Sequence, residues 1–260
     1  MVEAFRLRQY FAVLGPVVSQ AGTTCFSRRE FLSVSGWLLI FGAVAILGYI
    51  LTAVAAYFMG SIPTGYLAGR IRGIDIRAVG SGNIGATNVF RILGRTAGAL
   101  VLFVDALKGW LAVALVSGCI CRAFGAPADS VVFEWARIEA GVAVILGHNY
   151  TCWLRFKGGK GIATSAGVLL ALVPASLGII LAVWILVFAA TRYVSLASIA
   201  ASATLPFAAW LTGKSWTLII VTGALAVMAI LKHRANIKRL LNGTESRMVS
   251  RKEQAAKPTT

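Results

Sequence analysis

The chain has 260 residues, of which 58% are hydrophobic and only 13% are charged, and its mean hydropathy is +0.80. A soluble domain carries about 25% charged residues, so this composition excludes an ordinary soluble protein. The formal net charge of +16 comes without a basic helix or a base-stacking module. It therefore predicts no nucleic-acid partner and indicates attraction to anionic lipids or anionic substrates.

The apolar residues lie in long runs. Trp37–Met59 contains no charged residue, and a helix needs about 20 apolar residues to cross the hydrocarbon layer. Further runs follow at 96–121, 137–154, 162–173, 174–191, 194–212 and 216–231. Because 162–173 is short and Pro174 separates it from the next run, six to eight crossings are compatible. We predict an all-α integral membrane protein with about seven transmembrane helices and short, partly helical cytoplasmic loops.

The two ends of the chain differ from the rest. Residues 1–35 hold a short apolar patch and then Arg28, Arg29 and Glu30, and we treat them as an N-terminal extension of unknown role. The membrane domain is expected over residues 36–245. Residues 246–260 are expected to form a basic, disordered tail.

Basic residues predict the orientation. If the first span runs from outside to inside, all but eight Lys and Arg residues fall on one side of the membrane: Lys108 lies inside an apolar run, and seven lie on the other side. The seven on the other side are Arg6, Arg8, Arg28, Arg29, Arg122, Arg137 and Lys214. By the positive-inside rule the strongly basic side, which includes the C-terminus, is cytoplasmic.

Three polar clusters interrupt the apolar runs on that side: Gly80–Arg91, Gly147–Thr164 and Lys232–Glu245. Their glycines permit positive φ and let backbone N–H groups form a concave phosphate site. Lys160 stands just before a predicted helix, and helix N-termini bind anions. The clusters therefore predict anion binding, with solvated loops of no function as the alternative.

Two charged residues, Asp105 and Lys108, are separate from these clusters and lie inside an apolar run. A lone charge at mid-membrane is costly, so we expect a structural intramembrane pair, with a direct catalytic role as the alternative.

A nucleotide site is excluded by its surroundings. Gly80, Gly82 and Gly85 match G-x-G-x-x-G, and Asp105 follows at the spacing of a ribose-binding acid. However, that fingerprint requires a βαβ unit, and residues from Ala97 onward are predicted to span the membrane.

The four cysteines form no C-x-x-C pair, and two histidines are too few for a zinc site. We expect free thiols and no metal.

Taken together, the three clusters resemble the signature loops of the bacterial acyl-phosphate:glycerol-3-phosphate acyltransferases. The matching stretches are SGNIGATNVFR (81–91), GH…FKGGKGIAT (147–164) and HRANIKRL…GTE (233–245). The similarity spans about residues 37–245 and includes GSIPTGY (60–66) and DALKG (105–109). It departs from the pattern at Thr151, where the family is expected to carry proline.

The resemblance implies a seven-helix enzyme of the bacterial cytoplasmic (inner) membrane, and the distribution of basic residues places its N-terminus outside. It would move a fatty acyl group from acyl phosphate to the 1-hydroxyl of glycerol 3-phosphate, giving lysophosphatidic acid and phosphate in phospholipid synthesis. It would use no cofactor, and its partners would be both substrates, membrane lipid and, as a candidate, the soluble enzyme that makes acyl phosphate. The proton of the hydroxyl would pass to a histidine or to a phosphate oxygen of the substrate.

The site residues follow by position. The resemblance implies catalytic positions at Ser81, His148, Lys160, His233 and Asn236. It implies a substrate- and phosphate-binding set of Gly82, Asn83, Gly85, Thr87, Asn88, Arg91, Gly158, Gly159, Gly161, Thr164, Arg234, Arg239 and Glu245. The alternative function is a transporter of an organophosphate anion, which would place its polar groups near the midplane.

Overall fold

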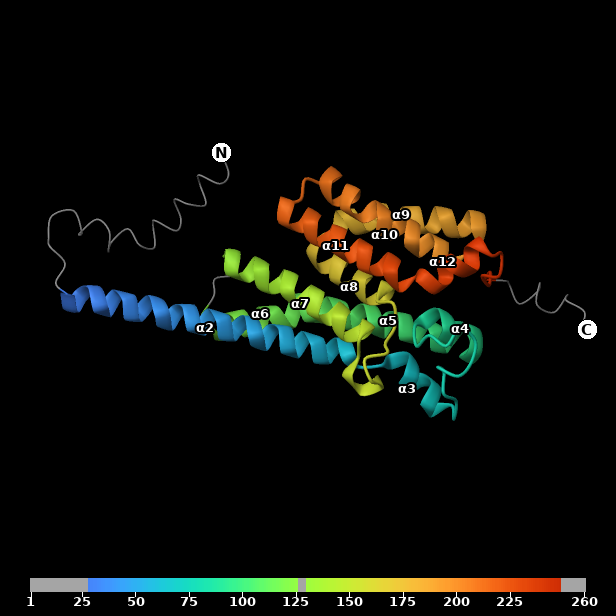
Figure 1. Cartoon of the computed structure of the whole chain (residues 1–260), viewed down its shortest axis with the longest axis horizontal. Helices are drawn as coiled ribbons and strands as arrows, with labels where there is room; N and C mark the ends of the chain where they lie inside the picture. The colour runs from blue at the N-terminus through green and yellow to red at the C-terminus, as the bar shows by residue number, and fades with distance from the viewer. Residues whose placement is uncertain (1–27, 126–129, 249–260) are drawn as a thin grey trace, which may run out of the picture. The chain divides into compact units, whose positions relative to one another are not determined.

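The computed structural model describes residues 28–125 and 130–248, with side chains described from Ala45 onward. In these residues every regular element is a helix, so the all-α prediction is confirmed. The chain divides into two compact units, residues 1–47 and 48–260. The first contributes the N-terminal part of helix α2 (Arg28–Ser61), and the second contains all three polar clusters (Figure 1).

In the second unit, the end of α2 is followed by α3 (Thr64–Ile71), α4 (Ala86–Leu93) and α5 (Arg95–Leu111). A π-helical turn, η2 (Ala112–Val116), joins α5 to α6 (Ser117–Ala123). The chain continues through α7 (Val131–Asn149), a short 3₁₀ turn η3 (Cys152–Leu154), α8 (Ile162–Leu172) and α9 (Pro174–Thr191). It ends with α10 (Val194–Leu211), α11 (Trp216–Lys232) and α12 (Arg234–Leu241).

The predicted apolar runs correspond to helices. Among the described residues, four stretches are long and apolar enough to cross a membrane: Ala45–Ile71, Arg95–Ala123, Pro174–Thr191 and Val194–Leu211. A fifth is added if α11 and α12 are taken as one span across their 57° bend. α8 is a shorter apolar helix. The number of crossings therefore stays a prediction.

One predicted run, 137–154, is wrong at both ends. α7 begins six residues earlier, where the Ser130 hydroxyl accepts a hydrogen bond from the backbone N–H of Phe133 at 3.2 Å, and it ends at Asn149. The helix therefore includes one charged residue, Glu134, that hydropathy alone would leave outside. Arg137 is accommodated because its guanidinium donates to the backbone oxygen of Ala171, near the end of α8, at 2.6 Å.

The predicted ends of the chain are described only in part. Residues 28–35 of the predicted extension are helical in α2, and residues 1–27 and 249–260 lie outside the described residues. Met248 donates its backbone N–H to Arg192 O at 2.9 Å. The first three residues of the predicted tail thus continue the described part of the second unit.

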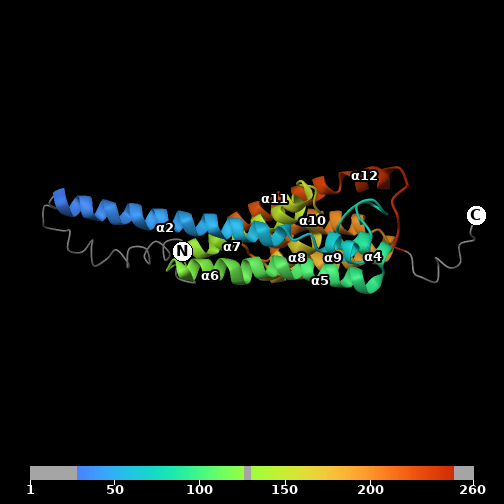
Figure 2. The same ribbon diagram turned by 90° about the horizontal axis from the view of Figure 1, so that it is seen from below.

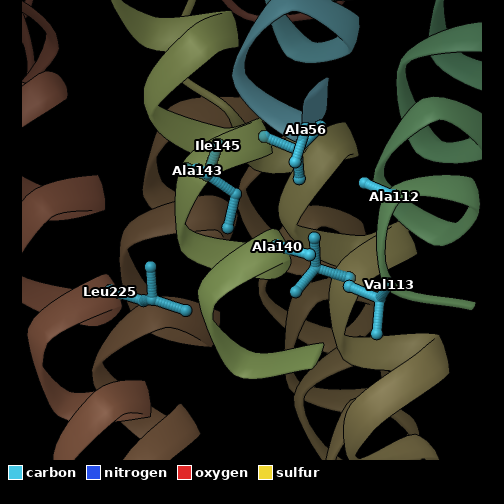
Figure 3. Packing of buried hydrophobic residues seen from close by; sticks show 9 residues of the cluster. Ala56, Ala112, Val113, Ala140, Ala143, Ile145 and Leu225 are labelled. Carbon is cyan, nitrogen blue, oxygen red and sulfur yellow. The ribbon is translucent and has the colours of Figure 1, made fainter. Parts of the chain in front are cut away.

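Small residues let the helices of the second unit pack closely. A buried cluster built on Ala56, Ala112, Ala140 and Ala143 joins α2, η2 and α7, and Leu225 of α11 completes it (Figure 3). In lipid the hydrophobic effect does not drive helices together, so their association depends on close packing. Small residues permit this packing because they let the helix backbones approach each other.

Glycines extend this packing at two crossings. Between α2 and α7, a Cβ at Gly60 would overlap the backbone oxygen of Val144. Between α5 and α8, a Cβ at Gly109 would overlap Thr164 O, and one at Gly167 would overlap Ala106 O. The start of α8 is therefore fixed against α5 at backbone distance.

The fold brings the polar clusters to one end of the second unit. Figures 1 and 2, which view the molecule from directions 90° apart, both show α4 and α12 toward the same end, and Figure 1 shows α3 there as well. The clusters are far apart in sequence, so their meeting is a product of the helix packing.

Candidate active site

The first polar cluster forms a loop that leads into α4. Gly80 and Gly82 have φ angles of +61° and +68°, values that residues other than glycine rarely adopt. The side chain of Asn88, 1% exposed, holds the loop closed. Its Oδ1 accepts from the N–H of Ser81 at 2.9 Å, and its Nδ2 donates to two preceding backbone carbonyls at 3.1 Å each. Ser81 is exposed at the tip of this fixed loop.

Asn83 completes the turn into α4. Its Oδ1 accepts from the N–H of Gly85 at 2.7 Å, and Gly85 precedes the first residue of the helix. The asparagines of this cluster therefore shape the loop through its backbone. Gly85 has a φ of −72°, so its role does not depend on positive φ.

The second cluster doubles back onto the end of α7. The N–H of Gly159 donates to His148 O at 3.0 Å, and that of Gly158 donates to Asn149 O at 3.2 Å. A Cβ at Gly158 would overlap His148 O, and one at Gly159 would overlap His148 Nε2. These two glycines serve close approach, whereas Gly161, with φ of +79°, has the predicted positive φ and precedes α8.

Lys160 links the second cluster to the third. Its Nζ donates to Asn236 Oδ1 at 2.5 Å, and Asn236 Nδ2 donates to Glu245 Oε1 at 2.6 Å. The same carboxylate accepts from the Ser195 hydroxyl at 2.7 Å and, through Oε2, from Arg239 Nε at 2.7 Å. Asn236 and Glu245 are 6% and 9% exposed. A carboxylate bound by three donors is suited to orient them rather than to meet a phosphate.

The segment after α12 joins the first cluster to this network. Arg91 donates to the backbone oxygen of Ser246, the residue after Glu245, at 2.9 Å. Arg247 lies over the ring of Tyr193, 5.0 Å from its centroid. All three predicted clusters are therefore connected by hydrogen bonds in the second unit.

The charges of this network follow from its burial. Burial lowers the pKa of Lys160 to about 8, and the nearby Glu245 carboxylate opposes that shift. For Glu245, burial by itself raises the pKa, but hydrogen bonds from Ser195, Asn236 and Arg239 outweigh it and hold the pKa below its usual value. Lys160 is thus cationic at neutral pH beside the N-terminus of α8, where the helix dipole also favours an anion.

The predicted pair of Asp105 and Lys108 is present and buried. Lys108 Nζ lies 2.8 Å from Asp105 Oδ1, and the two residues are 5% and 1% exposed. The same Oδ1 accepts from the Thr64 hydroxyl at 2.6 Å and lies 3.5 Å from His148 Nδ1. Lys108 also donates to Ile62 O at 2.9 Å.

Comparison with known proteins agrees with this geometry. The sequence model of the glycerol-3-phosphate acyltransferase family matches residues 50–243. The chain belongs to this family. A glycerol-3-phosphate acyltransferase of Desulforudis audaxviator is 48% identical over 210 residues, covering 80% of this chain and all of the relative. One from Geobacter sulfurreducens is 50% identical over 198 residues, covering 76% of this chain and 96% of the relative.

A solved structure of the family has the same fold. The crystal structure of PlsY, an integral membrane glycerol 3-phosphate acyltransferase, in its glycerol 3-phosphate form gives a TM-score of 0.70 at 37% identity. The match covers 80% of this chain and 99% of that chain. The resemblance inferred from the three loops is therefore confirmed, and this acyltransferase-family chain is an integral membrane protein.

The structure brings some predicted site residues together and separates others. Lys160, Asn236, Arg239 and Glu245 form one hydrogen-bonded group, and His233, 3% exposed, lies near it: burial first, and then the nearby Lys160 cation, disfavour the charged form of its ring. Others of the predicted set, including Arg234, which is exposed on α12, make no hydrogen bond to this group within the part of the chain that the structure describes.

Thr164 lies inside the helix packing. It is fully buried, and its hydroxyl has no hydrogen-bond partner among the described residues.

The sequence did not point to two residues that contact the candidate site. Ser195 holds Glu245 from α10, and its membership of an apolar run gave no signal. Lys232 donates to Asn149 O at 2.8 Å and lies over the ring of Tyr150, 3.8 Å from its centroid. Its position at the start of the third cluster was the available signal.

An apolar pocket adjoins the second cluster. It has a volume of about 390 Å³ and is lined by Ile62, Pro63, Tyr66, Leu67, Trp153 and Leu154. Trp153 and Leu67 are 63% and 46% exposed. The pocket therefore offers an apolar surface between α3 and the loop that carries Lys160.

Proposed function

We propose that this protein transfers a fatty acyl group from acyl phosphate to the 1-hydroxyl of glycerol 3-phosphate, giving lysophosphatidic acid and inorganic phosphate. Family membership supports the acceptor. The observation that carries the proposal is the Lys160–Asn236 hydrogen bond, because it holds a cation at the N-terminus of α8 between two of the three polar clusters. A site of this kind suits phosphate groups, which both substrates carry.

The reaction needs position and positive charge more than a strong acid. The acceptor hydroxyl oxygen attacks the acyl carbonyl carbon, the carbon–oxygen bond to phosphate breaks, and phosphate leaves with the electron pair. Phosphate is a good leaving group. Lys160, Arg239 and Arg91 supply positive charge around the network, and charge fixed in a partly buried site stabilises developing negative charge without reorganisation.

Two groups can take the hydroxyl proton. His233 Nδ1 lies 2.8 Å from Ala229 O. Because a carbonyl only accepts, this bond assigns the proton of a neutral ring to Nδ1 and leaves Nε2 as an acceptor. A phosphate oxygen of the substrate is the other candidate. A His233→Gln protein that keeps its kcat within a few-fold would assign the role to the substrate phosphate.

The alkyl chain of the acyl donor can lie in the apolar interior of the membrane. The pocket between α3 and the second cluster is open to an alkyl chain at the loop that carries Lys160. We place the polar clusters and the C-terminus in the cytoplasm and the N-terminus outside, in a bacterial cytoplasmic membrane. This side also gives access to a soluble enzyme that makes acyl phosphate. If an Asn83→Cys substitution in a variant without the four natural cysteines gives labelling from outside intact cells, that result would contradict the orientation.

The function is tested at Lys160 with a matched control. A Lys160→Ala protein is expected to insert in membranes and to lose lysophosphatidic acid formation, because the cation of the network is gone. Lys157, an exposed lysine of the same loop without a hydrogen bond from its side chain among the described residues, is the control, and Lys157→Ala should retain most of the activity. Full activity in Lys160→Ala would refute the assignment.

A further inference from the structure

The buried group of Asp105, Lys108, Thr64 and His148 is not used by the chemistry above, yet it lies directly behind the loop that carries Lys160. Three ionisable side chains at 5% exposure or less meet at one carboxylate oxygen. Desolvating charges is expensive, so such groups are retained where their arrangement serves a purpose or where both partners are fully bonded.

The contacts of this group lead from three helices to one loop. Asp105 Oδ1 receives Thr64 from the start of α3 and Lys108 from its own helix, and it faces His148 Nδ1 on the last turn of α7. The opposite side of the same imidazole, at Nε2, packs so closely on Gly159 that no side chain fits there. The His148 imidazole therefore lies between the Asp105 carboxylate and the backbone of Gly159, the residue before Lys160.

The other end of the loop is held by the same helix. Gly109 of α5, one residue after Lys108, contacts Thr164 O in the first turn of α8, and Ala106 O, one residue after Asp105, contacts Gly167. The segment from Gly159 to the start of α8 is thus supported at both ends by the part of α5 that carries the pair.

We propose that Asp105, Lys108 and Thr64 are positioning residues, which lock the His148 ring and through it set the position of the Gly159–Lys160 backbone in the phosphate site. This inference rests on the proposed function for its substrate. A positioning role and a merely structural ion pair predict different results. If the role is positioning, a variant that regains its stability without the Asp105 carboxylate does not regain its activity.

The test separates stability from positioning. Asp105→Asn and Lys108→Met each leave one buried charge unpaired and are expected to lower the thermal midpoint in detergent. The double variant Asp105→Asn/Lys108→Met removes both charges and should recover most of that midpoint. Its kcat/KM for glycerol 3-phosphate is nevertheless expected to stay down by about 100-fold, the order of loss that a displacement of about 1 Å causes. Recovery of kcat/KM together with the midpoint would overturn the proposal.

A milder pair of variants keeps the test valid if the double variant fails to fold. Thr64→Ser retains the hydroxyl that donates to Asp105 and should keep kcat/KM within a few-fold, whereas Thr64→Val, of similar volume, should lower it at least tenfold. Equal values for the two would contradict the positioning role. Arg137→Met is the control for a lost half-buried charge in α7, roughly 16 Å along the helix from His148 at 1.5 Å per residue. It should lower the midpoint without changing kcat/KM.

The proposed function and the positioning role fail separately. If the unaltered protein forms no lysophosphatidic acid, the function is refuted. Binding of inorganic phosphate then measures positioning: it should be at least tenfold weaker in Thr64→Val than in Thr64→Ser, and equal affinity would overturn the inference.

Discussion

The lowered pKa of Lys160 predicts how the reaction depends on pH. Burial brings this pKa to about 8 from an ordinary value of 10.5. With a pKa of 8, about 90% of the free enzyme carries the cation at pH 7 and about 10% at pH 9. Because kcat/KM follows the free enzyme, its value for glycerol 3-phosphate should fall about tenfold between pH 7 and pH 9. The second pKa of a phosphate monoester, near 6, lies outside this window.

The assay follows phosphate release as initial rates in detergent from pH 6.5 to 9.5. Lys160→Arg is the matched variant, because a guanidinium does not titrate in this range. The rate of Lys160→Arg is expected to be lower, because a planar guanidinium replaces a compact ammonium group. Its kcat/KM is not expected to fall above pH 8. A flat wild-type profile, or the same fall in Lys160→Arg, would refute the role of the Lys160 cation.

The sign of the linked effect on stability is opposite. A lysine with a lowered pKa holds fewer protons in the folded protein than in the unfolded chain between about pH 8 and 10.5. The lysine's contribution to the free energy of unfolding should therefore become more favourable as pH rises through this window. Lys160→Met should lack this rise in a denaturation series.

Two further predictions concern residues that support the site. Ser195→Ala removes one donor to the Glu245 carboxylate and is expected to cost about 1.5–3 kcal/mol, measured as the free energy of unfolding in detergent; an unchanged value would show that this bond contributes nothing. Thr151→Val removes the donor to Ser61 O, a fully buried contact of 2.6 Å, and should cost about 1–3 kcal/mol in the same measurement. A stabilised Thr151→Val protein would contradict this account of the loop.

The helices were predictable because a membrane leaves a strong signal in sequence. Apolar runs, and Pro174 between two of them, gave the positions of α8 and α9 closely. The start of α7 was not predictable in the same way. Its charged residues depress hydropathy, and the hydrogen bond from Arg137 to Ala171 O joins residues that are 34 positions apart, which no local pattern states.

The site was predictable as three clusters but not as a network. Positive φ at Gly80, Gly82 and Gly161 follows from glycine in a polar loop. The roles of Gly158 and Gly159 depend on how closely the loop meets α7, which no local pattern states.

Thr151 shows the same limit, since its expected replacement of a family proline gave no hint of its bond to Ser61 O. A proline cannot make that bond, because it has no side-chain donor. Tertiary contacts therefore determine the roles of Gly158, Gly159 and Thr151, which the sequence left open.

The central claim is the transfer of an acyl group from acyl phosphate to glycerol 3-phosphate. Its most direct test is purified protein given glycerol 3-phosphate and either acyl phosphate or acyl-CoA, with lysophosphatidic acid and phosphate both quantified. We predict equal amounts of the two products with acyl phosphate and no lysophosphatidic acid with acyl-CoA. Product from acyl-CoA alone, or phosphate release that does not depend on glycerol 3-phosphate, would contradict the account.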